Sequence, residues 1–189
     1  MHITAQEAIE IWPEGSREAA ELVIEAYGEP DEVTPTTLTW REAGSWKRIV
    51  ATATAFEHRF PAPHEDSVES VIDYAVPVER FADLAAFDGS VVAERTAGEL
   101  SARCHDEQAN ALALNLAHDI VTGAKDVAAA RDYYAKEFLD ARRGNPTPYM
   151  DGLRFASDTA TPDPDQRVLT DDDLERAVAE GHRRERTAS

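Results

Sequence analysis

The chain has 189 residues, and its 42% hydrophobic content is enough for the core of one domain and excludes wholesale disorder. Thirty-seven acidic residues against nineteen Lys and Arg give a formal net charge of −18, which makes nucleic acid an unlikely partner. The single cysteine excludes an internal disulfide framework, and no apolar run approaches the roughly 18 residues of a membrane span. The N-terminal residues lack the basic start and apolar stretch of a secretory signal. We therefore expect a cytoplasmic protein with no membrane partner.

The acidic residues are spread over the whole length, and lysine occurs only at Lys47, Lys125 and Lys136. Repulsion among so many like charges destabilises a compact chain at low ionic strength, and salt screens that repulsion. This composition favours halophilic adaptation to a salt-rich cytoplasm. An acidic protein from a high-GC bacterium is the alternative.

Two helices are predicted before the first strand. Thr4 and Glu7 have the spacing of a capping box at the start of the first helix. Ser16 is placed to cap the second, whose apolar residues recur on one face until Gly28 ends it.

Strand patterns occupy the middle of the chain. Segments 36–40 and 46–56 flank a Gly-containing turn, which predicts a hairpin, and segment 90–104 predicts a second hairpin around the turn "TAGE". Between them, residues 58–66 contain two prolines and predict an extended loop. Strand character then resumes at 71–76.

Helical patterns dominate the next part. Pro77 is placed in the first turn of a short helix that Gly89 ends. Two longer helices are predicted at about 106–122 and 126–140, the second capped by Asp126.

These elements predict an α+β fold: an antiparallel sheet built from two β-hairpins plus one further strand, packed by helices. Residues 1–144 form a single domain in this interpretation. Residues 145–189 turn polar and proline-containing, and they predict an extended C-terminal arm, partly disordered, with one short helix at 171–184.

The helix at 106–122 carries the first candidate site. On a helical wheel, the sector outside its apolar arc holds short polar side chains and no Lys, Arg or Glu, as in a covered face or a pocket wall. The candidate ligand-binding residues are Asn115, His118, Asp119, Gln108 and Cys104.

Two interpretations of this strip stay open. In the first it lines a pocket, and Cys104 near the helix N-terminus gains thiolate character. In the second, Asn115 and His118 are buried and fix how the helix docks, while Cys104 is a small core residue at the end of a strand. A Cys104–His118 dyad is excluded, because the fourteen residues between them span roughly 20 Å on one helix.

The proline-rich segment contains the second candidate, a metal site formed by His58, His64 and Asp66. The two histidines have a spacing that matches none of the standard zinc motifs. The alternative is a rigid loop across the sheet with solvated histidines.

The third candidate is an aromatic and basic patch of Trp40, Trp46, Lys47 and Arg48, which could bind an anion or stack on a base. The alternative is a pair of tryptophans packed in a hairpin, with the cations meeting nearby acidic residues.

The motifs of nucleotide-binding loops, nucleophile elbows, dithiol redox sites and zincins are absent from the sequence. We expect a small-molecule-binding domain, with a polar pocket beside the 106–122 helix that takes a small polar ligand. The alternative is a non-catalytic interaction protein that forms a homo-oligomer through its C-terminal arm. The sequence indicates neither a reaction nor a cofactor.

Overall fold

The computed structural model describes residues 3–157 and 165–187, and it confirms the predicted α+β class. The described residues form six α-helices, one short 3-10 turn (Val78–Arg80) and one antiparallel sheet of six strands. The helices are α1 (Ala5–Ile9), α2 (Glu14–Tyr27), α3 (Phe81–Phe87), α4 (Glu107–Thr122), α5 (Val127–Arg143) and α6 (Asp171–Thr187). The strands are β1 (Glu32–Thr34), β2 (Thr37–Ala43), β3 (Trp46–His58), β4 (His64–Asp73), β5 (Val91–Glu94) and β6 (Glu99–Cys104).

The sheet order is β1-β2-β3-β4-β6-β5, so the β2–β3 and β5–β6 hairpins lie on either side of β4. This agrees with the predicted two hairpins and one further strand, to which the structure adds the three-residue edge strand β1. The prediction for β4 was wrong at its start, which is residue 64 rather than 71. His64–Asp66 pair across the turn with Phe56–His58, so both prolines fall in the turn at 59–63 and leave the strand uninterrupted.

Two of the three predicted helix N-caps, Thr4 and Asp126, are present in the structure, and the third, Ser16, is not. The capping box of Thr4 and Glu7 is present, and Asp126 caps α5 through the backbone N–H of Ala129. Ser16 does not cap α2, because that helix already begins after Pro13. Ser16 is instead buried, and its hydroxyl donates to the carbonyl oxygen of Ala53 on β3 at 3.4 Å.

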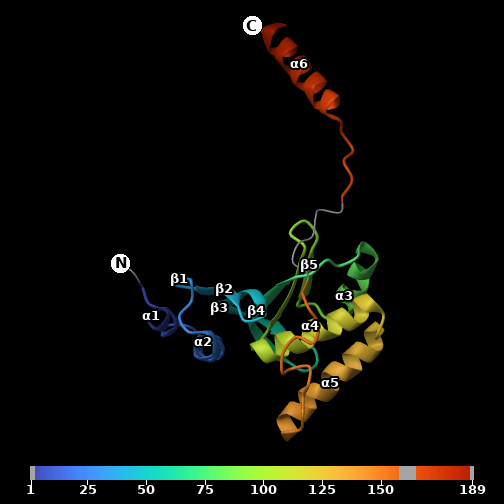
Figure 1. The fold of residues 1–189 in the computed structure, drawn as a ribbon. Helices are drawn as coiled ribbons and strands as arrows, with labels where there is room; N and C mark the ends of the chain where they lie inside the picture. Colours follow the sequence, from blue (N-terminus) through green and yellow to red (C-terminus); the bar gives the residue numbers. More distant parts are fainter. Residues whose placement is uncertain (1–2, 158–164, 188–189) are drawn as a thin grey trace.

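Helices α2 and α4 cover one face of the sheet, and α5 packs on the outer side of α4 (Figure 1). The core between these layers contains Ile49 and Ala51 of β3 and the leucines of α4. Alternation along β3 places Val50 and Thr52 on the opposite face of the sheet, where they line a shallow hollow.

After α5 the chain turns back and crosses α4 on its way toward the β5 end of the sheet (Figure 1). We call residues 148–155 the strap. Helix α6 stands apart from the sheet (Figure 1). No helix in the described part of the chain has the length and apolar character needed to cross a bilayer.

Candidate functional site

The strap covers the polar strip of α4. Asn115 is buried and donates to the carbonyl oxygens of Tyr149 and Gly152, each at 2.9 Å, while its own amide oxygen accepts from the backbone N–H of Arg154 at 2.8 Å. The ring of His118 stacks on Phe155 with the ring centroids 4.2 Å apart. The backbone of the strap thus occupies the amide groups of Asn115, the same groups that a ligand in a pocket would contact.

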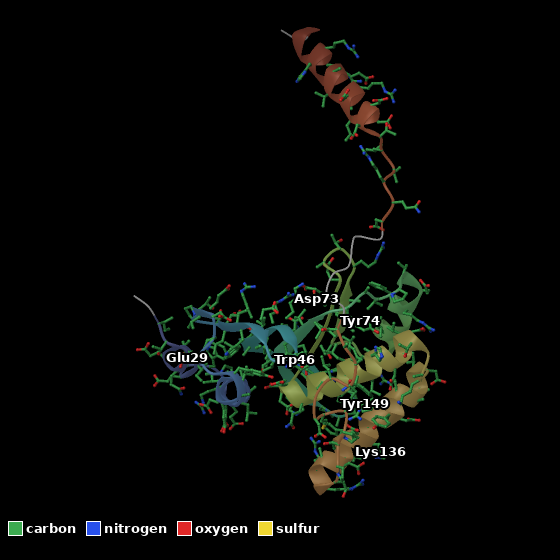
Figure 2. All side chains as sticks on the ribbon, in the orientation of Figure 1. Glu29, Trp46, Asp73, Tyr74, Lys136 and Tyr149 are labelled. Carbon is green, nitrogen blue, oxygen red and sulfur yellow. The ribbon has the colours of Figure 1, made fainter. Side chains whose placement is uncertain are left out.

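Neighbouring residues complete this covered face. His118 Nδ1 lies 2.8 Å from the Tyr74 hydroxyl, and the Asp119 carboxylate accepts from Lys125 at 2.6 Å and from the Tyr149 hydroxyl at 2.9 Å (Tyr74 and Tyr149 are labelled in Figure 2). Gln108 is exposed on the first turn of α4 and makes none of these contacts. The structure therefore brings Asn115, His118 and Asp119 together with the strap.

The aromatic and basic patch divides between the two faces of the sheet. Trp40 and Trp46 are buried, and their indole N–H groups donate to the Gly28 carbonyl at 2.9 Å and to Glu107 at 2.7 Å. Lys47 pairs with Asp73 of β4, and both Lys47 and Arg48 pair with Glu99 of β6. Trp46 and Asp73, the partner of Lys47, are labelled in Figure 2.

The proposed metal ligands meet at the end of the sheet where β3 turns into β4. His58 and His64 are directly opposite each other in the last pair of the β3–β4 ladder. Asp66 follows His64 at the period of two residues that keeps side chains on one face. Cys104, the last residue of β6, pairs with Val68 and so lies on the same face. Sheet register alone therefore gathers four donor residues.

The donor atoms lie close together. His64 Nε2 is 3.0 Å from Asp66 Oδ1 and 3.3 Å from Cys104 Sγ. His58 Nδ1 is 3.2 Å from Asp66 Oδ2, and His105 Nδ1 is 3.4 Å from Cys104 Sγ. Within the described residues they form two sets whose donors all lie within 4.8 Å of one another. We call His58, His64 and Asp66 the inner set, and His64, Cys104 and His105 the outer set.

Each histidine points one ring nitrogen into the cluster and the other at an acceptor outside it. His58 Nε2 lies 3.5 Å from Asp88 Oδ1, and His105 Nε2 lies 3.0 Å from Asp106 Oδ2. His64 Nδ1 lies 2.8 Å from the carbonyl oxygen of Ala62. Metal-bound histidines have this arrangement, in which an outer carboxylate or carbonyl fixes the tautomer and orients the ring.

The inner set contains two buried polar atoms that are not satisfied. His58 Nδ1 and Asp66 Oδ1 have no hydrogen-bond partner in the described part of the chain. Each lies near a neighbouring donor atom, but without the alignment of a hydrogen bond. The side chain of Asp66 is only 4% exposed. A buried carboxylate oxygen left in this state costs free energy unless something else compensates it.

Burial and the charge of Asp66 shift the pKa values of residues in the cluster. Burial raises the pKa of the Cys104 thiol well above its usual range, and the Asp66 charge acts in the same direction. Contact with the Asp66 carboxylate raises the pKa of His64. Burial likewise raises the pKa of Tyr134, whose hydroxyl lies 3.8 Å from Cys104 Sγ.

Of the two positions that the sequence left open for Cys104, the structure shows the end of a strand, where the thiol lies beside His64 and His105 and not on the polar strip of α4. His105, Asp88 and Tyr134 were not identified as site residues. His105 adjoins the only cysteine, and this was the one signal available for it. Comparison of the chain with models of known protein families, with curated proteins and with solved structures gave no match.

Proposed function

We propose that this protein binds one divalent transition-metal ion of the zinc class through His58, His64 and Asp66. The observation that carries the proposal is the pair of buried, unsatisfied atoms His58 Nδ1 and Asp66 Oδ1, which lie in one set of donors with His64. An ion between them would satisfy both atoms at once.

The donors would need to move apart only slightly to hold such an ion. Zinc binds nitrogen and carboxylate oxygen at about 2.0–2.2 Å, so two ligands of a tetrahedral ion lie about 3.3–3.5 Å apart. The two closest donor pairs of the inner set are separated by 3.0 and 3.2 Å. Imidazole donors also favour zinc, cobalt or copper over magnesium and calcium, which prefer oxygen ligands.

The number of ligands and their burial point to a bound ion with restricted access. Structural zinc sites use four protein ligands, whereas the three residues of the inner set leave one position of a tetrahedral ion unfilled. Their side chains are at most 18% exposed, which limits the access of a substrate to that position.

The proposal is tested by titrating chelator-stripped protein with zinc chloride in a calorimeter. We expect one ion per chain, and a loss of affinity of at least tenfold in His58→Gln and in Asp66→Asn. His182→Gln, on the exposed surface of α6, is the matched control and should bind as the wild type does. Absence of binding to the wild-type chain, or unchanged affinity in both site variants, would overturn the proposal.

Assembly through the C-terminal arm is a second proposal, with a second copy of the chain as the partner. Leu174 and Val178 are exposed on one face of α6. Asp171 and Asp173 at the start of the helix already pair within the chain, with Arg167 and Arg176, so the exposed apolar face is what a second copy would cover. The full chain should then sediment with the mass of a dimer and a chain ending at residue 165 with the mass of a monomer. A full chain that sediments as a monomer, or a truncated chain that is still a dimer, would overturn this proposal.

A further inference from the structure

We infer that the metal ion reaches the inner set through the outer set, with His64 bound to it in both positions. This inference rests on the proposed function and adds a route of entry and release. It makes His105 and Cys104 exchange residues, distinct in role from the ligands that hold the ion at rest.

His105 is the most exposed donor of the cluster, while Cys104 of the outer set is buried and His58 of the inner set is 18% exposed. The His105 side chain is 42% exposed, whereas those of His64 and Asp66 are 11% and 4% exposed. His105 is therefore the donor that an incoming ion meets first.

The turn between β3 and β4 closes another side of the cluster. The Phe60 ring packs 5.1 Å from the Tyr134 ring and 6.3 Å from the Phe87 ring, measured between centroids. The Arg131 guanidinium lies over the other side of Phe60, 3.8 Å from its centroid. An ion passing there would have to displace this packing, which the route through His105 leaves intact.

His64 is placed to keep hold of the ion during the exchange. Its Nδ1 is fixed by the Ala62 carbonyl, so Nε2 is the atom that binds, and it lies 3.0 Å from Asp66 Oδ1 and 3.3 Å from Cys104 Sγ. An ion on the outer set can therefore exchange Cys104 and His105 for Asp66 and His58 one ligand at a time. Cys104 binds as the thiolate, its proton passing to the buffer, and regains a proton when the ion moves on.

The inner set is the resting position because its donors are the ones left unsatisfied. His58 Nδ1 and Asp66 Oδ1 lack partners, whereas Cys104 Sγ contacts His64, His105 and Tyr134. An ion in the inner set gives partners to two buried unpaired atoms, whereas an ion in the outer set gives partners to atoms that already have contacts. Binding at the inner set therefore removes more of the free-energy cost of buried unpaired groups.

The test is rapid mixing of chelator-stripped protein with cobalt chloride, a zinc substitute whose thiolate complexes absorb in the near ultraviolet. The thiolate-to-cobalt absorption should rise and then fall as the ion moves from Cys104 to the inner set. In His105→Ala, association and chelator-driven release should both slow at least tenfold, with equilibrium affinity changed less than threefold. Cys104→Ala should abolish the transient absorption, and His182→Ala is the control.

Two results would overturn this inference while leaving the proposed function intact. Unchanged association and release rates in His105→Ala would exclude entry through the outer set. A loss of equilibrium affinity in His105→Ala as large as that in His58→Gln would make His105 an ordinary ligand. Failure of the wild-type chain to bind zinc in the calorimeter would instead remove the proposed function itself.

Discussion

Glu99 joins β3 to β6 across the sheet through two cations. Its carboxylate accepts a bidentate pair of hydrogen bonds from Arg48, at 2.8 and 2.6 Å, and lies 2.9 Å from Lys47 Nζ. The Arg48 guanidinium, followed by Lys47, lowers the pKa of Glu99 from 4.5 to about 2. Two of the four residues in the candidate anion-binding patch are therefore occupied by this carboxylate.

The Glu99→Gln substitution should lower the free energy of unfolding at pH 7 by about 1–2 kcal/mol, since the partially exposed cations are screened by solvent. The folded-state pKa lies below the unfolded one, so this contribution is full above about pH 4.5 and is lost as the pH falls toward 2. Urea unfolding of the wild type and of Glu99→Gln at pH 7, 4.5 and 3 measures this contribution, and the exposed Glu18→Gln is the control. A difference between wild type and Glu99→Gln that stayed constant over this range would contradict the assignment.

At the level of single residues, the sequence identified the inner set because His58, His64 and Asp66 lie within nine residues of one another. It left Cys104 open between the polar strip, reached by extending the helix at 106–122 back by one turn, and the end of a strand. In the structure Cys104 ends β6, and its neighbours are set by pairing with Val68, thirty-six positions earlier. Register between distant strands is not contained in local periodicity.

At the level of secondary-structure elements, the strap explains why one face of α4 has short polar side chains: the strap covers that face. It has no regular secondary structure, and its backbone groups at Tyr149, Gly152 and Arg154 are satisfied by the single side chain of Asn115. Such a segment leaves no periodic pattern in the sequence, so the strip was recognised and the C-terminal tail was one possible cover, but the covering residues were not identified. The helices with clear caps were predicted closely, while the strand β4 was obscured by the prolines before it.

Replacing Asn115 with alanine should lower the free energy of unfolding by about 2–4 kcal/mol, because two carbonyls and one N–H lose a buried partner. The strap should also become more accessible to proteases. Chemical denaturation measures the first effect, with Gln108→Ala, exposed on the same helix, as the control. A cost below about 0.5 kcal/mol would show that the strap is not held by Asn115.

For the whole molecule, the order of hairpins and helices could be predicted because each element has its own local signals, and an antiparallel sheet joins neighbours in sequence. The pairing of β4 with β3 follows from their short connection, whereas its pairing with β6 does not, because residues 74–90 and strand β5 lie between β4 and β6 in the chain. The outer set depends on this topology, since His64 comes from β4 whereas Cys104 and His105 come from the junction of β6 with α4. Its three residues are brought together only by the pairing of β4 with β6, which local sequence patterns do not give.

The net charge of −18 belongs to the molecule as a whole, and its consequence is a dependence on salt. Raising sodium chloride from 0.1 to 2 M at pH 7 should raise the melting temperature by about 5–10 °C, because shorter screening lengths weaken repulsion among the acidic groups. The control is the same titration near the isoelectric point of about 4.6, where the net charge vanishes and the rise should be at most half as large. Equal rises at both pH values, or none at pH 7, would show that charge repulsion does not limit the stability of this fold.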